Sequence, residues 1–383
     1  MRFLFKTDYN TDINLMQHSG QWWSYGLLLA ALAAVPFLFG NYVQSQFVFV
    51  FIYAIVGVAL MILTGFTGQA SLGHAAFLAI GAYTAAILQA RGFGFAIYFP
   101  LAGLISGIIG LLVGFPALRL HGLYLLIATI SFGFIVEEIL SRWETVTHGN
   151  EGLQVKTLNL FGMPVPRDSK EFYFLCLGTL IATIVLTLNL LRSPTGRALM
   201  AVRDSETAAK SMGVNLAVTK VKAFGLSAAF TGFAGALFAH KMSFISPEMF
   251  TLLLSIEFIM IIIIGGVIGL HGAILGAIFV VMVDPLLTLL KDDAPIWVAT
   301  ITRMLGFGAD VVARAQATTA SIGSAAGLKG AIYGILIMIF IIYEPYGLYG
   351  RWLKLKLYFQ TFPLYKASTF KRQKTYVKTE RNR

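Results

Sequence analysis

The chain has 383 residues, of which 57% are hydrophobic and only 12% are charged. A composition this apolar excludes an ordinary soluble globular domain, and several apolar runs are long enough to span a bilayer. A formal net charge of +11 would suggest nucleic acid in a soluble chain, but here a positive-inside bias and a basic tail account for it. We therefore predict an all-α integral membrane protein with no nucleic-acid partner.

The apolar runs predict about ten transmembrane helices in a single polytopic domain over residues 1–350. Glycines interrupt the third predicted span and the stretch Leu253–Leu290, so re-entrant or broken helices are an alternative there. The predicted spans are Trp23–Phe39, Phe47–Leu63, Gln69–Leu88, Phe95–Phe115, Leu123–Leu140, Phe172–Leu191, Val221–His240, Thr251–Ile268, Ala273–Leu290 and Leu328–Tyr343.

The distribution of positive charge predicts the orientation. Ten spans with a cytoplasmic N-terminus place 19 of the 29 Lys and Arg residues on the cytoplasmic side, as the positive-inside rule favours. The polar segment Arg192–Lys222 and the basic tail, residues 351–383, then both lie in the cytoplasm. Aromatic residues alternate with the charges of the tail, which favours anchoring on anionic lipid, with RNA or a protein partner as alternatives.

Arg192–Lys222 is a long polar segment between two predicted spans, and its first half has the signals of a helix. Ser193 can cap this helix, and Pro194 occupies the first helical position, where its missing N–H costs nothing. We expect the helix to run to about Val202.

A second short helix is predicted over Ser205–Met212, with Asp204 or Ser205 as its cap. Glu206 lies in its first turn, and Gly213 follows it at the position that favours a left-handed C-cap. A helix of about eight residues is marginal alone in water. Another surface must therefore hold it.

Small and polar residues in the spans suggest where helices pack closely and where a pathway runs. Glycine stripes allow close packing, and they also allow helices to slide. The stripes are Gly103, Gly107, Gly110 and Gly114 in the fourth span, and Gly272 and Gly276 in the ninth.

The stretch 65–74 brings polar side chains to the start of the third span. One interpretation is a capped helix start with His74 bonded to a backbone carbonyl, and the other is the lining of a conduit or gate. Glu257, within the eighth span, must be paired, protonated or facing a water-filled cavity. The candidate pathway or gate residues are Gln69, Ser71, His74, Glu257, Ser227 and Thr231.

Several chemistries are excluded by missing motifs. The chain has no G-x-x-x-x-G-K-[ST] phosphate loop, no H-E-x-x-H or paired C-x-x-C zinc pattern, and no G-x-S-x-G elbow. We therefore predict no catalytic residues, no metal and no cofactor in this chain. Any ATP that drives it must be bound by another subunit.

Several motifs, in order along the chain, resemble the M-type permease subunit of branched-chain amino-acid (LIV-type) ABC importers. The first, GFTGQASLGHAAFLAIGAY, is similar to the signature stretch of these permeases, and RSPTGRALMAVRDSETAAKSMGVN is similar to their cytoplasmic coupling segment. The matching stretches are residues 65–83, 121–140, 147–153, 192–215, 246–277 and 343–352.

The resemblance implies the helical fold of large, type II-like importers in a bacterial plasma (inner) membrane, with both termini cytoplasmic. It implies a homologous second permease, two cytoplasmic ATPase subunits that bind ATP, an extracytoplasmic substrate-binding protein and membrane lipid as partners. It marks Glu257 as a family feature without a role. The residues that it places at the ATPase contact are Arg203, Asp204, Ser205, Glu206, Ala208, Ala209 and Gly213.

The predicted function is that of a transmembrane permease subunit for Leu, Ile or Val, driven by separate ATPases. One alternative is a urea- or amide-type permease of the same family, and another is an ion-coupled secondary transporter that acts alone. The segment 291–327 is longer than the resemblance leads us to expect.

Overall fold

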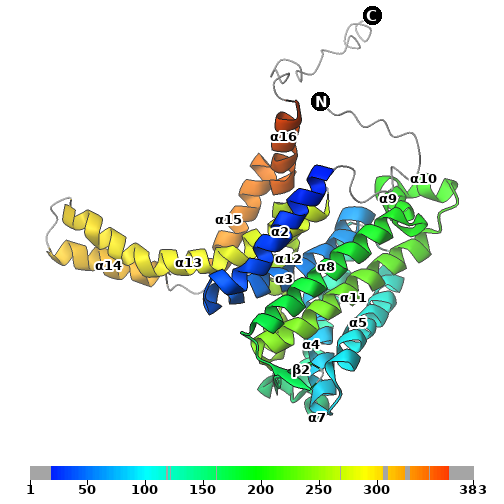
Figure 1. The fold of residues 1–383 in the computed structure, drawn as a ribbon, viewed down its shortest axis with the longest axis horizontal. Coiled ribbons are helices and arrows are strands. Elements are labelled where there is room, and N and C mark those ends of the chain that lie inside the picture. Colours follow the sequence, from blue (N-terminus) through cyan, green and yellow to red (C-terminus); the bar gives the residue numbers. More distant parts are fainter. Residues whose placement is uncertain are drawn as a thin grey trace, which may run out of the picture.

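The computed structural model describes residues 19–117, 120, 122–160, 162–267, 269–304, 309–323, 328–344 and 346–361 (Figure 1). The predictions for the tail from residue 362 onward lie outside these residues. The fold is almost entirely helical, and its α-helices are α2 (Ser19–Leu38), α3 (Asn41–Leu60), α4 (His74–Ala90), α5 (Phe95–Ala117), α6 (Leu123–Arg142), α7 (Glu144–Thr147), α8 (Lys170–Arg192), α9 (Pro194–Asp204), α10 (Glu206–Ser211), α11 (Leu216–Met242), α12 (Leu252–Gly265), α13 (Leu270–Met304), α14 (Ala309–Gly323), α15 (Leu328–Tyr343) and α16 (Gly347–Thr361).

Helices α3 and α11 form the centre of the helical body. Most of the apolar length of each is buried inside the protein, whereas α5, α6 and α8 expose most of theirs. Helix α11 packs against α5, α4 and α3, and α3 also packs against α8 and α13. In Figure 1, α9 and α10 lie at one end of this body, and α7 and the strand β2 (Leu158–Leu160) lie at the other.

Six helices in the described part of the chain are long and apolar enough to cross a membrane, which agrees with an all-α membrane protein. The stretches Trp23–Leu38, His74–Ala90 and Leu270–Val283 are shorter apolar helices. The total of ten spans therefore stays a prediction.

Several predicted spans have different bounds in the structure. The second begins at Asn41 rather than at Phe47, and the seventh begins at Leu216 rather than at Val221. The third begins at His74 rather than at Gln69, because a π-helical turn (Met61–Gly65) ends α3 and irregular backbone precedes α4. The ninth does not end at Leu290, because α13 continues to Met304 and α14 folds back along it (Figure 1). Helix α16 runs through residue 350, where we placed the border between the domain and the tail.

The glycine stripes are sites of close helix packing, as predicted. On α5, Gly107 faces Ala229 and the Gly225 carbonyl of α11, and the other stripe glycines lie against the same helix. On α13, Gly272 and Gly276 lie against the backbone at the end of α12. The small residues let these backbones approach to distances that a Cβ would prevent.

The segment between α6 and α8 forms a loop with short helices and strands of its own. Strands β2 and β3 (Met163–Val165) form a hairpin in it, and β1 (Leu153–Gln154) pairs antiparallel with β4 (Phe244–Ile245), which follows α11. The loop is therefore fastened to the end of α11.

An ion pair also fastens this loop. Lys241 Nζ lies 2.7 Å from Asp168 Oδ1, and the lysine side chain is only 4% exposed, against 47% for the aspartate. Gln44 of α3 donates to the Ser169 carbonyl at 2.8 Å. His240 and Lys241, in the last turn of α11, are both buried, since the loop covers them.

Gly110→Ala tests the close contact between α5 and α11. An added Cβ would fall on the Ala228 side chain and lie 2.9 Å from the Phe224 carbonyl oxygen. We expect overpacking to lower the free energy of unfolding by about 1–3 kcal/mol, measured by thermal unfolding in detergent. Gly178→Ala in α8 is the matched control, because nothing lies within 4 Å of its added Cβ. Equal effects of the two substitutions would contradict the packing argument.

The ion pair predicts a pH dependence of stability. The hydrogen bond from Lys241 lowers the pKa of Asp168 against an opposing effect of burial, and the charges of Lys241 and Arg167 lower it further. The pKa of Asp168 is lower in the folded state than in the unfolded state, where it is about 3.9. The ion pair therefore contributes its full stabilisation of the folded state above the unfolded-state pKa, and this contribution is lost as pH falls through the folded-state pKa. We expect the melting temperature of Asp168→Asn to be lower than that of the wild-type protein at neutral pH. The difference between the two melting temperatures should close below about pH 4. Asp204→Asn, at an exposed site, is the control, and a pH-independent gap would contradict the prediction.

Candidate functional site

The predicted helix pair in Arg192–Lys222 is present, with the predicted caps. The Ser193 hydroxyl accepts from the Gly196 amide at 3.3 Å, and Pro194 begins α9. The Ser205 hydroxyl accepts from the Ala208 amide at 3.3 Å and begins α10, so Ser205 rather than Asp204 is the cap. Helix α9 runs two residues beyond the predicted Val202, and α10 has six residues rather than eight.

Helices α9 and α10 lie on the body with one apolar side buried. Leu199 and Val202 of α9 and Ala209 of α10 are buried, and Leu199 packs in a cluster with residues of α3 and α11. Met212, just after α10, is 73% exposed, although it is a large apolar residue. Gly213 follows it with φ = +85°, as predicted for a C-cap. Met212 was not among the predicted ATPase-contact residues. Of those residues, Ser205 and Glu206 are half-buried, Ala209 is buried, and the exposed ones are Arg203, Asp204, Ala208 and Gly213.

An ion pair joins α10 to α11. Lys220 Nζ lies 2.8 Å from Glu206 Oε1, and their side chains are 4% and 36% exposed. The family resemblance placed Glu206 at a contact with another subunit, and this intramolecular partner was not predicted. The available signal was the presence of two lysines, Lys220 and Lys222, in the first turns of α11, ahead of its apolar stretch.

The stretch 65–74 lies directly against α9. Gly68 has φ = +73°, and a Cβ on it would lie 3.6 Å from the Arg203 Cα. The two most distinctive motifs of the sequence, far apart along the chain, are therefore neighbours in the fold.

His74 is held between two serines rather than by a backbone carbonyl, which corrects our first interpretation of it. Its Nε2 lies 2.8 Å from Ser227 Oγ, and its Nδ1 lies 3.2 Å from Ser71 Oγ. The Ser227 hydroxyl donates to the Ala59 carbonyl at 2.6 Å. Because that bond uses the serine proton, His74 must donate from Nε2–H and accept at Nδ1 from Ser71. The neutral Nε2–H tautomer thus joins α4, α11 and α3.

Side chains from other helices satisfy the start of α4. The Leu72 amide donates to Thr129 Oγ1 at 3.0 Å, and the Ala75 amide donates to Ser255 Oγ at 3.1 Å. Gln69 is buried, and within the described residues neither polar atom of its side-chain amide has a hydrogen-bond partner. Thr231 bonds back to the Ser227 carbonyl at 2.9 Å and is fully buried, so it lines no opening in this conformation.

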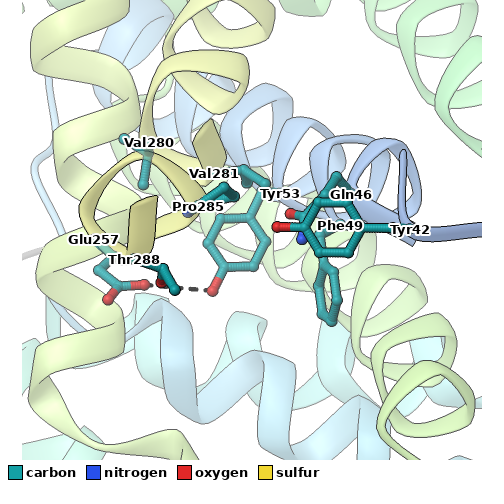
Figure 2. A pocket seen from close by; sticks show the side chains of 9 residues that line it. All are labelled: Tyr42, Gln46, Phe49, Tyr53, Glu257, Val280, Val281, Pro285 and Thr288. Carbon is teal, nitrogen blue, oxygen red and sulfur yellow. Dashed lines mark hydrogen bonds between the residues drawn. The ribbon is translucent and has the colours of Figure 1, made fainter. Parts of the chain in front are cut away.

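Glu257 is separate from this network and lines a cavity of about 270 Å³ between α3, α12 and α13 (Figure 2). The Tyr53 hydroxyl donates to Glu257 Oε2 at 3.3 Å. Glu257 is 5% exposed and has a hydrogen-bond partner, which is one of the states that its position suggested, and it also faces a cavity. The cavity is lined by Tyr42, Gln46, Phe49, Tyr53, Glu257, Val280, Val281, Pro285 and Thr288.

The features described so far are those of a membrane permease. They are an apolar, almost entirely helical body, buried polar networks between its helices, and a polar helix pair docked at one end. The family model described as "Branched-chain amino acid transport system / permease component" matches residues 42–341. The chain therefore belongs to the permease components of branched-chain amino acid transport systems.

Individual relatives agree with this family. The chain is 37% identical to the high-affinity branched-chain amino acid transport system permease protein LivM of Salmonella typhimurium, and 36% identical to LivM of Escherichia coli, each over 279 residues. These alignments cover 67% of this chain and 66% of each relative, just under two thirds of its length. A shorter stretch of 122 residues is 30% identical to the autoinducer 2 import system permease protein LsrC of Salmonella paratyphi B, over 30% of this chain and 35% of the relative. No solved structure matches the chain significantly.

Ser227→Ala tests the network around His74. The substitution leaves His74 Nε2 and the Ala59 carbonyl without their buried partner, so we expect the free energy of unfolding to fall by about 1–3 kcal/mol. Ser131→Ala in α6 is the matched control, because Ser131 is exposed and bonds only within its own helix in the structure. Thermal unfolding of both variants in detergent measures the difference, and an unchanged melting temperature of Ser227→Ala would contradict the network.

Proposed function

We propose that the chain is the permease subunit of an ATP-driven importer of branched-chain amino acids such as Leu, Ile and Val. The observation that carries the proposal is the capped helix pair α9–α10, which is docked on the body through its apolar side and presents a charged face with the exposed Met212. Membership of the branched-chain amino acid permease family supports the substrate class.

The proposed assembly contains two permeases, this chain and a homologous partner, which together form the translocation path. Two cytoplasmic ATPase subunits bind ATP and contact the coupling segment, residues 192–222. An extracytoplasmic binding protein delivers the substrate. The absence of a phosphate loop in the sequence supports an energy source in other subunits.

The proposed orientation in the bacterial inner membrane has both termini and the coupling segment in the cytoplasm. The charge distribution supports it, because this orientation leaves most Lys and Arg residues inside. The helices α9 and α10 lie at the end of the body opposite α7 and β2, so the ordered loop 143–169 then faces the extracytoplasmic side (Figure 1).

We propose that motion of the coupling segment reaches the spans through α11. The ion pair between Glu206 and Lys220 ties α10 to the start of α11. Ser227 lies seven residues further on, about 10 Å along the helix, and bonds to His74 at the start of α4. A rigid shift of α10 would therefore displace α11 and the α4 start together. Packed interfaces of this kind change between discrete arrangements rather than deforming continuously.

The exposed face of the coupling segment provides the test. Arg203→Glu and Met212→Glu change exposed side chains, so we expect unchanged melting temperatures. If this face binds the ATPase, both variants should lose at least about tenfold in ATPase co-purification and in leucine uptake by the reconstituted importer. Glu206 is unsuited to this test, because its loss would also leave Lys220 buried without its partner.

Arg91→Glu is the matched control, because Arg91 is exposed beyond the end of α4 remote from α9 and α10. It should leave ATPase co-purification at the wild-type level. If Arg203→Glu and Met212→Glu behave like Arg91→Glu, the ATPase binds another surface and the proposed contact is wrong.

A further inference from the structure

Helix α13 continues beyond the part of it that crosses the body. Near its start, His271 Nε2 lies 2.8 Å from the Tyr25 hydroxyl of α2, and further along Thr288 lines the Glu257 cavity together with Tyr42 at the start of α3. The stretch from His271 to Thr288 is about 26 Å long, close to the roughly 30 Å thickness of a bilayer core. The helix has therefore crossed the membrane by Thr288, and residues 289–304 lie beyond the crossing.

This continuation leaves the body at the end remote from the coupling segment. Tyr42 lies at the start of α3, whereas the other end of α3 leads to Gly68, which lies against Arg203 of α9. A charged run, residues 291–293, follows in the sequence, and charges of this kind are costly in the apolar core of a bilayer. The rest of α13 therefore lies at or outside the membrane surface.

Beyond the crossing, the end of α13 (residues 296–304) and α14 form a projecting helical hairpin. The two helices pack against each other, and Ala299 of α13 and Val312 of α14 are buried. In Figure 1 this α13–α14 hairpin runs away from the rest of the body, at a clear angle to α8 and α11. Pro295 lies within this part of α13, and a proline allows a helix to bend.

The side of α13 that faces away from Ala299 is apolar, and the described part of the chain leaves it uncovered. Trp297, Ile301 and Met304 are 56%, 54% and 85% exposed. Spacings of four and three residues place them on one side of the helix, whereas Ala299 is two residues from both Trp297 and Ile301 and so lies on the opposite side. The three side chains form a continuous stripe rather than scattered surface residues.

A lipid surface is the occupant that fits this stripe. Tryptophan is enriched at the level of the lipid headgroups, where its ring is buried while its N–H stays near water. Helices that lie in this region have an apolar side and basic residues on their other sides. The charged residues in the described part of the hairpin are Arg303, Asp310 and Arg314, all exposed, and their positive balance suits phosphate groups.

We propose that the α13–α14 hairpin is a membrane-surface anchor, with Trp297, Ile301 and Met304 inserted at the boundary between lipid headgroups and acyl chains. Under the proposed orientation this is the extracytoplasmic leaflet. The segment 291–327, which is longer than the family resemblance leads us to expect, then holds the end of α13 at the bilayer. The inference depends on the membrane location of the chain and not on the solute that it carries.

A fluorescent label at position 301 tests the anchor in the importer reconstituted into nanodiscs of phosphatidylcholine and phosphatidylglycerol. Ile301→Cys is labelled with a nitrobenzoxadiazole maleimide, while the native Cys176 is buried. A second set of nanodiscs contains a lipid with a nitroxide quencher near the top of its acyl chain. We expect the nitroxide lipid to lower the fluorescence at least about twofold, because the label lies at the depth of that quencher. Iodide in the water should have little effect.

Arg303→Cys is the matched control, because Arg303 is exposed on the same helix but lies two residues from Ile301 and so on the opposite side. Its label should be quenched more by iodide than by the nitroxide lipid. Strong iodide quenching at position 301 would overturn the anchor, because the stripe would then lie in water. Protection of position 301 from both quenchers would also overturn it, because another protein surface would then cover the stripe.

Trp297→Ser in the Ile301→Cys reporter tests whether the stripe itself holds the hairpin in the lipid. We expect the ratio of nitroxide to iodide quenching to fall at least about twofold, because the largest apolar side chain of the stripe is lost. Trp143→Ser removes a tryptophan that is 53% exposed at the end of α6, outside the hairpin, and should leave the ratio unchanged. Equal ratios in the two variants would overturn the role of the stripe.

Discussion

Backbone contact between α11 and its neighbours is the constraint on which the rest of the fold depends. Gly81 of α4 lies against the backbone of Gly232, and Gly235 lies against the Leu78 carbonyl, so no side chain separates the two helices. In a bilayer, where apolar lipid competes equally for apolar side chains, such close packing and interhelical hydrogen bonds hold helices together. The buried bond between His74 and Ser227 exists because the glycines bring α4 and α11 close enough to form it.

The same helix α11 links the candidate functional regions. Its first turns carry Lys220, which pairs with α10, its middle carries Ser227, and its last turn carries Lys241, which holds the loop at the other end. Helix α11 thus contacts α10 at one end of the body, His74 at its centre and the loop between α6 and α8 at the other end. Displacement at one end therefore has a direct mechanical route to the other along this one helix.

Local features were predictable from sequence, and long-range partners were not. The caps Ser193 and Ser205 and the left-handed Gly213 depend on a few neighbouring residues, and all are confirmed. The partners of His74 and Glu206 lie 153 and 14 residues away, and no local pattern specifies them. The length of α13 was underestimated because the prediction ended a span where hydropathy fell, although a helix can continue beyond the apolar stretch.

Helix α13 has 35 residues, so it is about 52 Å long, while its apolar first part is packed in the body. Its first part, as far as Thr288, lines the Glu257 cavity, and the rest of it projects away from the body with α14 (Figure 1). A tilt of about 5° of the packed part would move the tip by roughly 2 Å, since the stretch from Thr288 to Met304 is about 24 Å long. A partner that binds the projecting part of α13 would therefore act, through one continuous helix, on a wall of the cavity.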